Sequence, residues 1–394
     1  MKKLLLATAA AALTVGAAGA EEIKLGTLIG FTGPIESLTP SMAAAAELAA
    51  KEISDSGKLL GGSTITMVRA DSTCTDAAVA QAAAEKLVTG DGVKGIVGAD
   101  CSGVTGAVLS NVAVPNGIVM ISPSATSPAL STAEDKGLFF RTAPSDAREG
   151  EIAADIMIER GVKTAAMTYT NNDYGKGLAE AIQKSFEAKG GKITISAAHE
   201  DGKSDYSAEV GALAAAGGDI LIVAGYLDQG GAGIIQAALD TGAFSTFELP
   251  GGMIGTSLDE RFGTALNGSY GQIAGSDSAG AETFATMATA AGFDGKSAYT
   301  PESYDAAALI ALAMQAAGSS DPAAYAAKVM DVANAPGEKI MPGELAKGLE
   351  LLAAGTDIDY EGATAVELVG PGESAGRYRE IEVKDGVQTT VKFR

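Results

Sequence analysis

Residues 95–126 read GIVGADCSGVTGAVLSNVAVPNGIVMISPSAT and contain a complete strand, helix and strand. The runs at 95–98 and 118–121 are short and apolar, as is typical of strands that are buried on both faces. Between them, residues 102–114 have small and apolar side chains at helical spacing. Strands that alternate with helices in this way form a parallel sheet covered by helices on both faces. This stretch therefore predicts an α/β fold.

The same alternation continues on both sides of this stretch, in two successive series. We therefore expect two doubly wound parallel-sheet lobes. The first series has strands at 23–29, 64–69, 95–98 and 118–121, helices at 40–54, 76–89 and 102–114, and a closing crossover at 138–144. The second has strands at 164–168, 192–197, 220–224 and 247–249, and helices at 149–160, 175–189, 207–216 and 233–241.

The last third of the chain is predicted to return into each lobe. Its pattern predicts helices at 281–291, 303–317 and 321–332, followed by short strands at 363–369 and 378–384. Asp385-Gly386 is a typical two-residue hairpin turn after the last of these strands.

The first 20 residues, MKKLLLATAAAALTVGAAGA, have the features of a secretory signal peptide. Two lysines precede an apolar run that is too short to span a bilayer, and small residues follow in the A-x-A pattern that precedes a cleavage site. An amphipathic helix is the alternative, but this run is apolar on every side. We therefore expect export, with 374 residues in the mature chain.

The formal net charge is −21, and it becomes −23 without the two leader lysines. A chain this acidic repels phosphate groups, which argues against nucleic acids and anionic membranes as partners. Its two cysteines, Cys74 and Cys101, both follow the leader. In an oxidising compartment such a pair indicates a disulfide, with two buried thiols as the alternative.

Recognisable catalytic motifs are missing from the sequence. His199 is the only histidine, and it precedes a charged loop where a solvated surface role is expected. The chain has no G-x-S-x-G elbow, no phosphate-binding P-loop and no C-x-x-C pair. We therefore predict no catalytic residue, no metal site and no cofactor.

Hydroxyl side chains follow two neighbouring strands of the first lobe. Ser102 comes after strand 95–98 and opens a helix, and Ser124 and Thr126 follow strand 118–121. Backbone N–H groups and hydroxyls at such positions can hold a carboxylate without a basic side chain. The alternative is that these residues only cap helices. In the second lobe, Tyr174 and Tyr226 follow strands 164–168 and 220–224, where tyrosines either pack in the core or wall a ligand.

Taken in order, several motifs resemble the periplasmic solute-binding proteins of branched-chain amino acid ABC transporters, the leucine/isoleucine/valine-binding type. The motifs are IKLG at 23–26, FTGP at 31–34, DSTC at 71–74, CS at 101–102, ISPSATSP at 121–128, FRT at 140–142, DYGKG at 173–177 and GY at 225–226. The resemblance covers nearly all of the mature chain.

This resemblance implies a type I binding protein, whose two lobes are joined by three crossings and close on a hinge around the solute. It implies a periplasmic monomer that serves an ABC permease in the inner membrane, with a disulfide near the cleft. The lobes are expected at 21–142 plus 273–360 (N-terminal) and at 143–272 plus 361–394 (C-terminal).

The resemblance also implies roles for individual residues. Ser102, Ser124 and Thr126 match positions that hold the ligand's carboxylate, and Tyr174 and Tyr226 match positions that close over it. Gly251 stands where the family usually has an acid that pairs with the ligand's ammonium, and Leu38 stands where an aromatic side chain is expected.

Burial of an ammonium group without an anion would cost free energy, so the absence of the usual acid allows two interpretations of the ligand site. Either another acid substitutes, with Asp228 and Asp277 as the candidates, or the ligand is a small organic acid or amide without an α-ammonium. An exported sensor or enzyme of the same fold is a further alternative.

Overall fold

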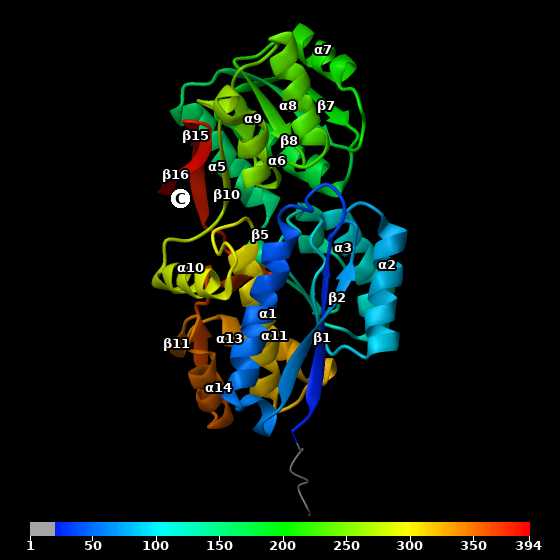
Figure 1. Cartoon of the computed structure of the whole chain (residues 1–394), viewed down its shortest axis with the longest axis vertical. Helices are drawn as coiled ribbons and strands as arrows, with labels where there is room; N and C mark the ends of the chain where they lie inside the picture. Colours follow the sequence, from blue (N-terminus) through cyan, green and yellow to red (C-terminus); the bar gives the residue numbers. More distant parts are fainter. Residues whose placement is uncertain (1–19) are drawn as a thin grey trace, which may run out of the picture.

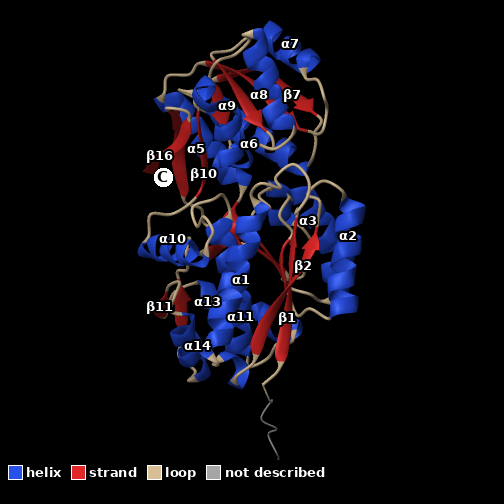
Figure 2. Cartoon of the chain, in the orientation of Figure 1, coloured by secondary structure: helices blue, strands red, loops and turns tan. Residues whose placement is uncertain are grey.

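The computed structural model describes residues 20–394, which form two lobes stacked along the long axis of the molecule (Figure 1). Each lobe has a central, mostly parallel sheet with helices on both faces (Figure 2). The predicted α/β class and the two doubly wound lobes are confirmed. The predicted leader, apart from Ala20, lies outside the described residues.

The first sheet has seven strands in the order β13-β14-β5-β4-β3-β1-β2. Helices α1 and α11 pack together on one side of it, and α2 and α3 pack together on the other. The strands are β1 (Glu22–Ile29), β2 (Thr64–Asp71), β3 (Ile96–Gly98), β4 (Met120–Ser122), β5 (Phe139–Pro144), β13 (Leu368–Val369) and β14 (Glu373–Ser374). The helices are α1 (Thr39–Ser56), α2 (Ala77–Glu85), α3 (Ser102–Val108) and α11 (Thr300–Ala317).

The second sheet repeats this arrangement, with the order β16-β15-β10-β9-β8-β6-β7. Helix α5 packs with α6, and α7 packs with α8. The strands are β6 (Thr164–Thr170), β7 (Lys192–His199), β8 (Ile220–Ala224), β9 (Phe247–Leu249), β10 (Tyr270–Ala274), β15 (Tyr378–Lys384) and β16 (Val387–Phe393). The helices are α5 (Asp146–Glu159), α6 (Asp173–Ala188), α7 (Ser207–Ala216) and α8 (Gly230–Thr241).

Short elements complete the lobes. They are α4 (Val114–Asn116), α9 (Thr256–Phe262), α10 (Ala279–Ala291), α12 (Pro322–Tyr325), α13 (Val329–Ala333), α14 (Leu345–Ala353) and a small sheet of β11 (Glu338–Ile340) with β12 (Ile358–Tyr360). The predicted helix 321–332 is thus broken into α12 and α13. The predicted strand 363–369 is wrong for its first five residues, because the backbone N–H groups of Ala363 and Thr364 donate to the Asp305 carboxylate and not to a strand.

The chain passes between the sheets three times: from β5 to α5, from β10 to α10, and from β14 to β15 (Figure 1). Strands β13 and β14 belong to the first sheet, although they fall in the range 361–394 that the sequence analysis placed in the C-terminal lobe. Strand β10 likewise extends the second sheet to Ala274. Two-residue edge strands have too little pattern to indicate which sheet they join.

Local sequence signals explain where several elements begin and turn. The Asp76 carboxylate accepts hydrogen bonds from the N–H groups of Ala78 and Val79, and so caps α2. The hairpin between β15 and β16 turns at Asp385 and Gly386, both with positive φ, as the sequence predicted. Among residues 20–394, no helix is long and apolar enough to cross a membrane.

Candidate functional site

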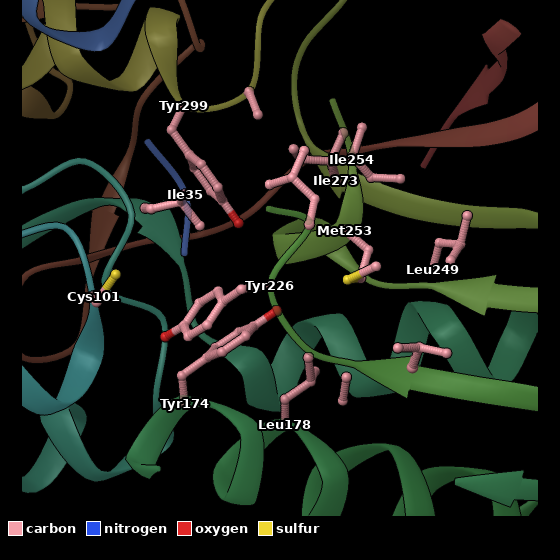
Figure 3. Packing of buried hydrophobic residues seen from close by; sticks show 14 of the residues in the cluster. Ile35, Cys101, Tyr174, Leu178, Tyr226, Leu249, Met253, Ile254, Ile273 and Tyr299 are labelled. Carbon is pink, nitrogen blue, oxygen red and sulfur yellow. The ribbon is translucent and has the colours of Figure 1, made fainter. Parts of the chain in front are cut away.

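A small cavity lies where the carboxyl ends of the two sheets meet, which is where open α/β sheets bind ligands. Both lobes contribute to its wall: Ile35, Leu38, Asp100, Cys101, Ser102, Ser124, Tyr174, Tyr226, Gly252 and Tyr299. The cavity measures about 20 Å³, roughly the room for one water molecule. The lobes are therefore closed on each other, and the side chains of Tyr174, Tyr226 and Tyr299 come together at this point (Figure 3).

The first-lobe wall contains the three hydroxyl residues that the sequence singled out. Ser102 Oγ accepts hydrogen bonds from the backbone N–H groups of Thr126 and Ser127, at 3.2 and 3.0 Å. Ser124 Oγ donates to the Asp100 carbonyl at 3.0 Å. Thr126 Oγ1 is buried and has no hydrogen-bond partner among the described residues. The structure thus brings the three residues together. The Ser102 hydroxyl proton is free to be donated, whereas the Thr126 hydroxyl also acts on the Asp146 carboxylate and lowers its pKa.

Two buried charged side chains hold this wall in place. Arg141, which is 1% exposed, donates to the carbonyls of Ala125 and Ser127 and pairs with Glu373 at 2.5 Å. Asp100 accepts from the Gly30 N–H and the Ser72 hydroxyl, both at 2.7 Å. Their hydrogen bonds are made within the protein, so both side chains position the loops.

The second-lobe wall is a pair of stacked tyrosines. The rings of Tyr174 and Tyr226 have centroids 5.1 Å apart and an interplanar angle of 20° (Figure 3). Tyr174 sits in the first turn of α6, and its hydroxyl accepts from the Gly252 N–H at 3.1 Å. Burial raises the pKa of both phenols well above the ordinary value, so both remain neutral donors. The pair provides a flat apolar wall with hydroxyls at its edge.

Tyr299 approaches the tyrosine pair from the first lobe, just before α11 (Figure 3). Its hydroxyl comes close to Gly251, where an added Cβ atom would lie 2.7 Å from it. Beside the same glycine lies Glu149, whose Oε1 accepts from the Gly251 N–H at 2.8 Å and from Gln272 Nε2 at 3.1 Å. Neither Tyr299 nor Glu149 was among the candidate site residues predicted from the sequence.

A sequence signal for the buried acids of α5 does exist. Asp146 and Glu149 have helical spacing to Ala153 and Ile156, so all four share the apolar face of the helix. A carboxylate on such a face is rarely fully buried unless it has a partner.

The two acids proposed as substitutes for the missing one do not line the cavity. Asp228 bridges the lobes at its rim, where Oδ2 accepts from the Ser37 N–H at 2.9 Å and Oδ1 accepts from the Ser257 hydroxyl at 2.8 Å. Asp277 is exposed on the crossing that leads from β10 to α10, and it lines a separate cavity of about 310 Å³ at the hinge.

The predicted disulfide is present, and it joins the loop after β2 to the start of α3 beside the cavity. The expected surface role of His199 is wrong: the ring is 1% exposed, and its Nδ1 lies 2.8 Å from Thr168 Oγ1. Burial lowers its pKa to about 4, so the ring is neutral. Within the described part of the chain, no group of three or more His, Cys, Asp or Glu side chains is arranged to hold a metal ion.

Comparison with known proteins identifies the family of this chain. Residues 22–344 match the model of a family described as periplasmic binding protein. The chain belongs to this family. It is 31% identical over 339 residues to a Leu/Ile/Val-binding protein homolog of Brucella melitensis, an alignment that covers 84% of this chain and 89% of the relative. This membership makes it a binding protein and not an enzyme.

Solved structures share the fold at lower sequence identity. A leucine-binding protein of Thermotoga maritima superimposes with a TM-score of 0.78 at 19% identity, covering 94% of this chain and 98% of the other. A solute-binding protein from R. palustris in complex with benzoate gives 0.74 at 21% identity, with 95% and 96% coverage. The same fold therefore holds ligands with and without an amino group.

Proposed function

We propose that this periplasmic binding protein captures a small carboxylated solute, an amino acid, between its lobes and delivers it to an ABC permease in the inner membrane. The observation that carries the proposal is the meeting of hydroxyls from one lobe with stacked tyrosines from the other across a single small cavity. The name of the Brucella relative supports an amino acid as the solute.

The first-lobe wall suits a carboxylate. The Ser102 hydroxyl has a free proton, the Thr126 hydroxyl belongs to the same wall, and the backbone N–H groups that open α3 lie beside Ser102. Hydrogen bonds from such donors to a carboxylate are roughly twice as strong as bonds between neutral groups. A solute seated here would lay its side chain against Tyr174 and Tyr226.

Binding requires the lobes to move. A cavity of about 20 Å³ is too small for an amino acid, so the lobes must part for a solute to enter and close less tightly around it than they close here. The three crossings between the sheets are the segments around which such a motion would turn.

The predicted leader at 1–20 supports export into the periplasm, where a binding protein meets its permease. Co-purification of membrane components with the tagged, exported protein tests this part of the proposal. We expect a permease in the captured fraction and a monomer by light scattering.

The ligand itself is tested by calorimetry on protein that has been unfolded, dialysed and refolded to remove carried solute. The panel contains the twenty amino acids, small organic acids such as benzoate, and neutral amides and sugars. We expect a carboxylated solute to bind and the neutral compounds to fail. Binding of a sugar or an amide, with every carboxylate inactive, would refute the proposal.

A further inference from the structure

The wall of the cleft has an excess of buried acids. Asp100 lines the cavity, and Asp146 and Glu149 lie close to Tyr174 and Tyr299, where burial first and then these two acids raise the pKa of both phenols. Among the described residues, no Lys, Arg or His lines the cavity. Arg141 is the buried cation of this wall, but its guanidinium already donates to two backbone carbonyls and to the Ser131 hydroxyl. It also pairs with the Glu373 carboxylate. The acids near the cleft therefore lack an equivalent positive charge.

Glu149 lies at the carboxyl end of β9, beside Gly251, which has no side chain. Both of its carboxylate oxygens lie 3.6 Å from where a Cβ atom on Gly251 would stand. Oε1 is held by Gly251 and Gln272, while Oε2 accepts no hydrogen bond from the described residues. A side chain at residue 251 would occupy this spot, so the glycine leaves the carboxylate room to reach the cleft.

Asp146, three residues earlier on α5, adds a second unsatisfied acid. It is fully buried, and burial together with the neighbouring Glu149 raises its pKa well above the ordinary value, while the Thr126 hydroxyl and Arg141 act against this rise. Its backbone N–H donates to the Thr126 carbonyl at 2.8 Å, which ties the acid to the hydroxyl wall. The Asp146 oxygens and Thr126 Oγ1 make no hydrogen bond of good geometry to any other described residue. Buried polar atoms without partners point to a ligand that supplies them.

We propose that Glu149, backed by Asp146, binds the ammonium group of the solute, which makes this a site for amino acids and not for carboxylates without an amine. The inference rests on the proposed function, because it takes the hydroxyl wall as the seat of the carboxylate. An ammonium against Glu149 would donate one of its three N–H groups to the free Oε2, and its positive charge would stabilise the ionised form of the acid.

The other acids near the cleft are already engaged. Asp100 is satisfied by Gly30 and Ser72, and Asp228 is held at the rim by Ser37 and Ser257. Tyr299 belongs to the first lobe and lies over Gly251 only while the lobes are closed, so their separation uncovers Glu149 for an incoming amine.

The test compares each amino acid with the 2-oxo acid that has the same side chain, such as leucine with 4-methyl-2-oxopentanoate. The refolded wild-type chain, Glu149→Gln and Glu302→Gln are titrated by calorimetry. Glutamine keeps the shape and the acceptor oxygen of Glu149 and removes only its charge. Glu302 is the matched control, because it is equally buried but lines the separate cavity at the hinge.

We expect at least one amino acid to bind the wild type, its 2-oxo counterpart to bind about 100-fold more weakly, and Glu149→Gln to lose about 100-fold for the amino acid. Glu302→Gln should keep wild-type affinity. A 2-oxo acid or benzoate that binds as tightly as any amino acid, or a Glu149→Gln protein with unchanged affinity, would overturn the inference and leave intact the proposal that the cleft captures a small carboxylated solute. If no carboxylate binds at all, the proposed function itself fails. The wild-type comparison decides the question even if Glu149→Gln does not fold.

Discussion

The carboxylate of Asp228, in the second lobe, accepts a hydrogen bond from the backbone N–H of Ser37, in the first lobe, at 2.9 Å. A second bond runs beside it, from the Asp228 N–H to the Pro34 carbonyl at 3.1 Å. Both can exist only while the lobes are together. Asp228 is thus placed to hold the closed form at the rim of the cleft.

Asp228→Ala should therefore speed release of the solute and leave the association rate nearly unchanged. A hydrogen bond to a charged group contributes about 1.5 to 3 kcal/mol, and this one is partly exposed, so we expect about a 10-fold loss of affinity. Stopped-flow fluorescence measures both rates, with Asp240→Ala on the surface of α8 as the control. A loss of 1,000-fold or more would instead support Asp228 as the partner of the ligand ammonium.

Binding of an amine should release protons near neutral pH. Burial raises the pKa of Glu149 to about 7, so part of the free protein carries a proton there, and a bound cation lowers that pKa. Affinity should therefore rise as the pH increases from 6 to 8. The titratable groups around Glu149 are acids and phenols: Asp146, Glu248, Tyr174, Tyr299 and Tyr378.

Calorimetry in buffers of different ionisation enthalpy measures this release. We expect a dependence on the buffer for the wild type and a much smaller one for Glu149→Gln. Identical heats in all buffers at pH 7 would contradict the ionisation of Glu149 on binding.

Glu248 should make the protein less stable as the pH rises. It lies in β9 with both oxygens buried and unpartnered, and burial, followed by the charge of Glu149, raises its pKa to about 8. Its unfolded value is near 4.5, so the folded state holds the proton more tightly. The resulting stability is complete below pH 4.5 and is lost as the pH rises through 8.

Glu248→Gln should flatten this dependence by roughly 3 to 5 kcal/mol between pH 4.5 and 8. Urea unfolding at several pH values gives the measurement, and Glu282→Gln, an exposed acid on α10, is the control. Parallel pH profiles for the wild type and Glu248→Gln would show that the prediction is wrong.

The disulfide between Cys74 and Cys101 should contribute about 3 kcal/mol to the free energy of unfolding, because it closes a loop with a sequence separation of 27 residues. The double variant Cys74→Ser/Cys101→Ser should therefore unfold at a lower temperature. Calorimetric scans check this, and reduction of the wild type should lower its melting temperature similarly. An unchanged melting temperature in both cases would contradict it.

Much of the fold was predictable because its signals are local. Strand β8 is a short apolar run, β9 is a short strand with apolar residues at both ends, and α7 is rich in small and apolar residues, so all three match their predicted bounds. The two-residue strands β13 and β14 were not predictable in the same way. Strand β14 pairs with β5, more than two hundred residues earlier, and its own two residues contain no trace of that partner.

Some residues of the candidate site were likewise predictable from the sequence, and others were not. Ser102, Ser124, Tyr174 and Tyr226 follow strand ends, and the rule that ligands bind there locates them from sequence. Asp228 also follows a strand end, but the closed lobes place its carboxylate against Ser37 at the rim and not in the cavity.

The sequence by itself determined the α/β class, the two repeated lobes and the hydroxyl and tyrosine walls, because periodicity and strand ends are properties of neighbouring residues. Only the tertiary structure brought Glu149 to Gly251, across 102 residues of chain. The physical reason is that the pattern of a helix predicts only which of its residues are buried. The pattern does not indicate which strand end lies against the buried face. That contact depends on how α5 packs on the second sheet, and it decides that Glu149 lies beside Gly251.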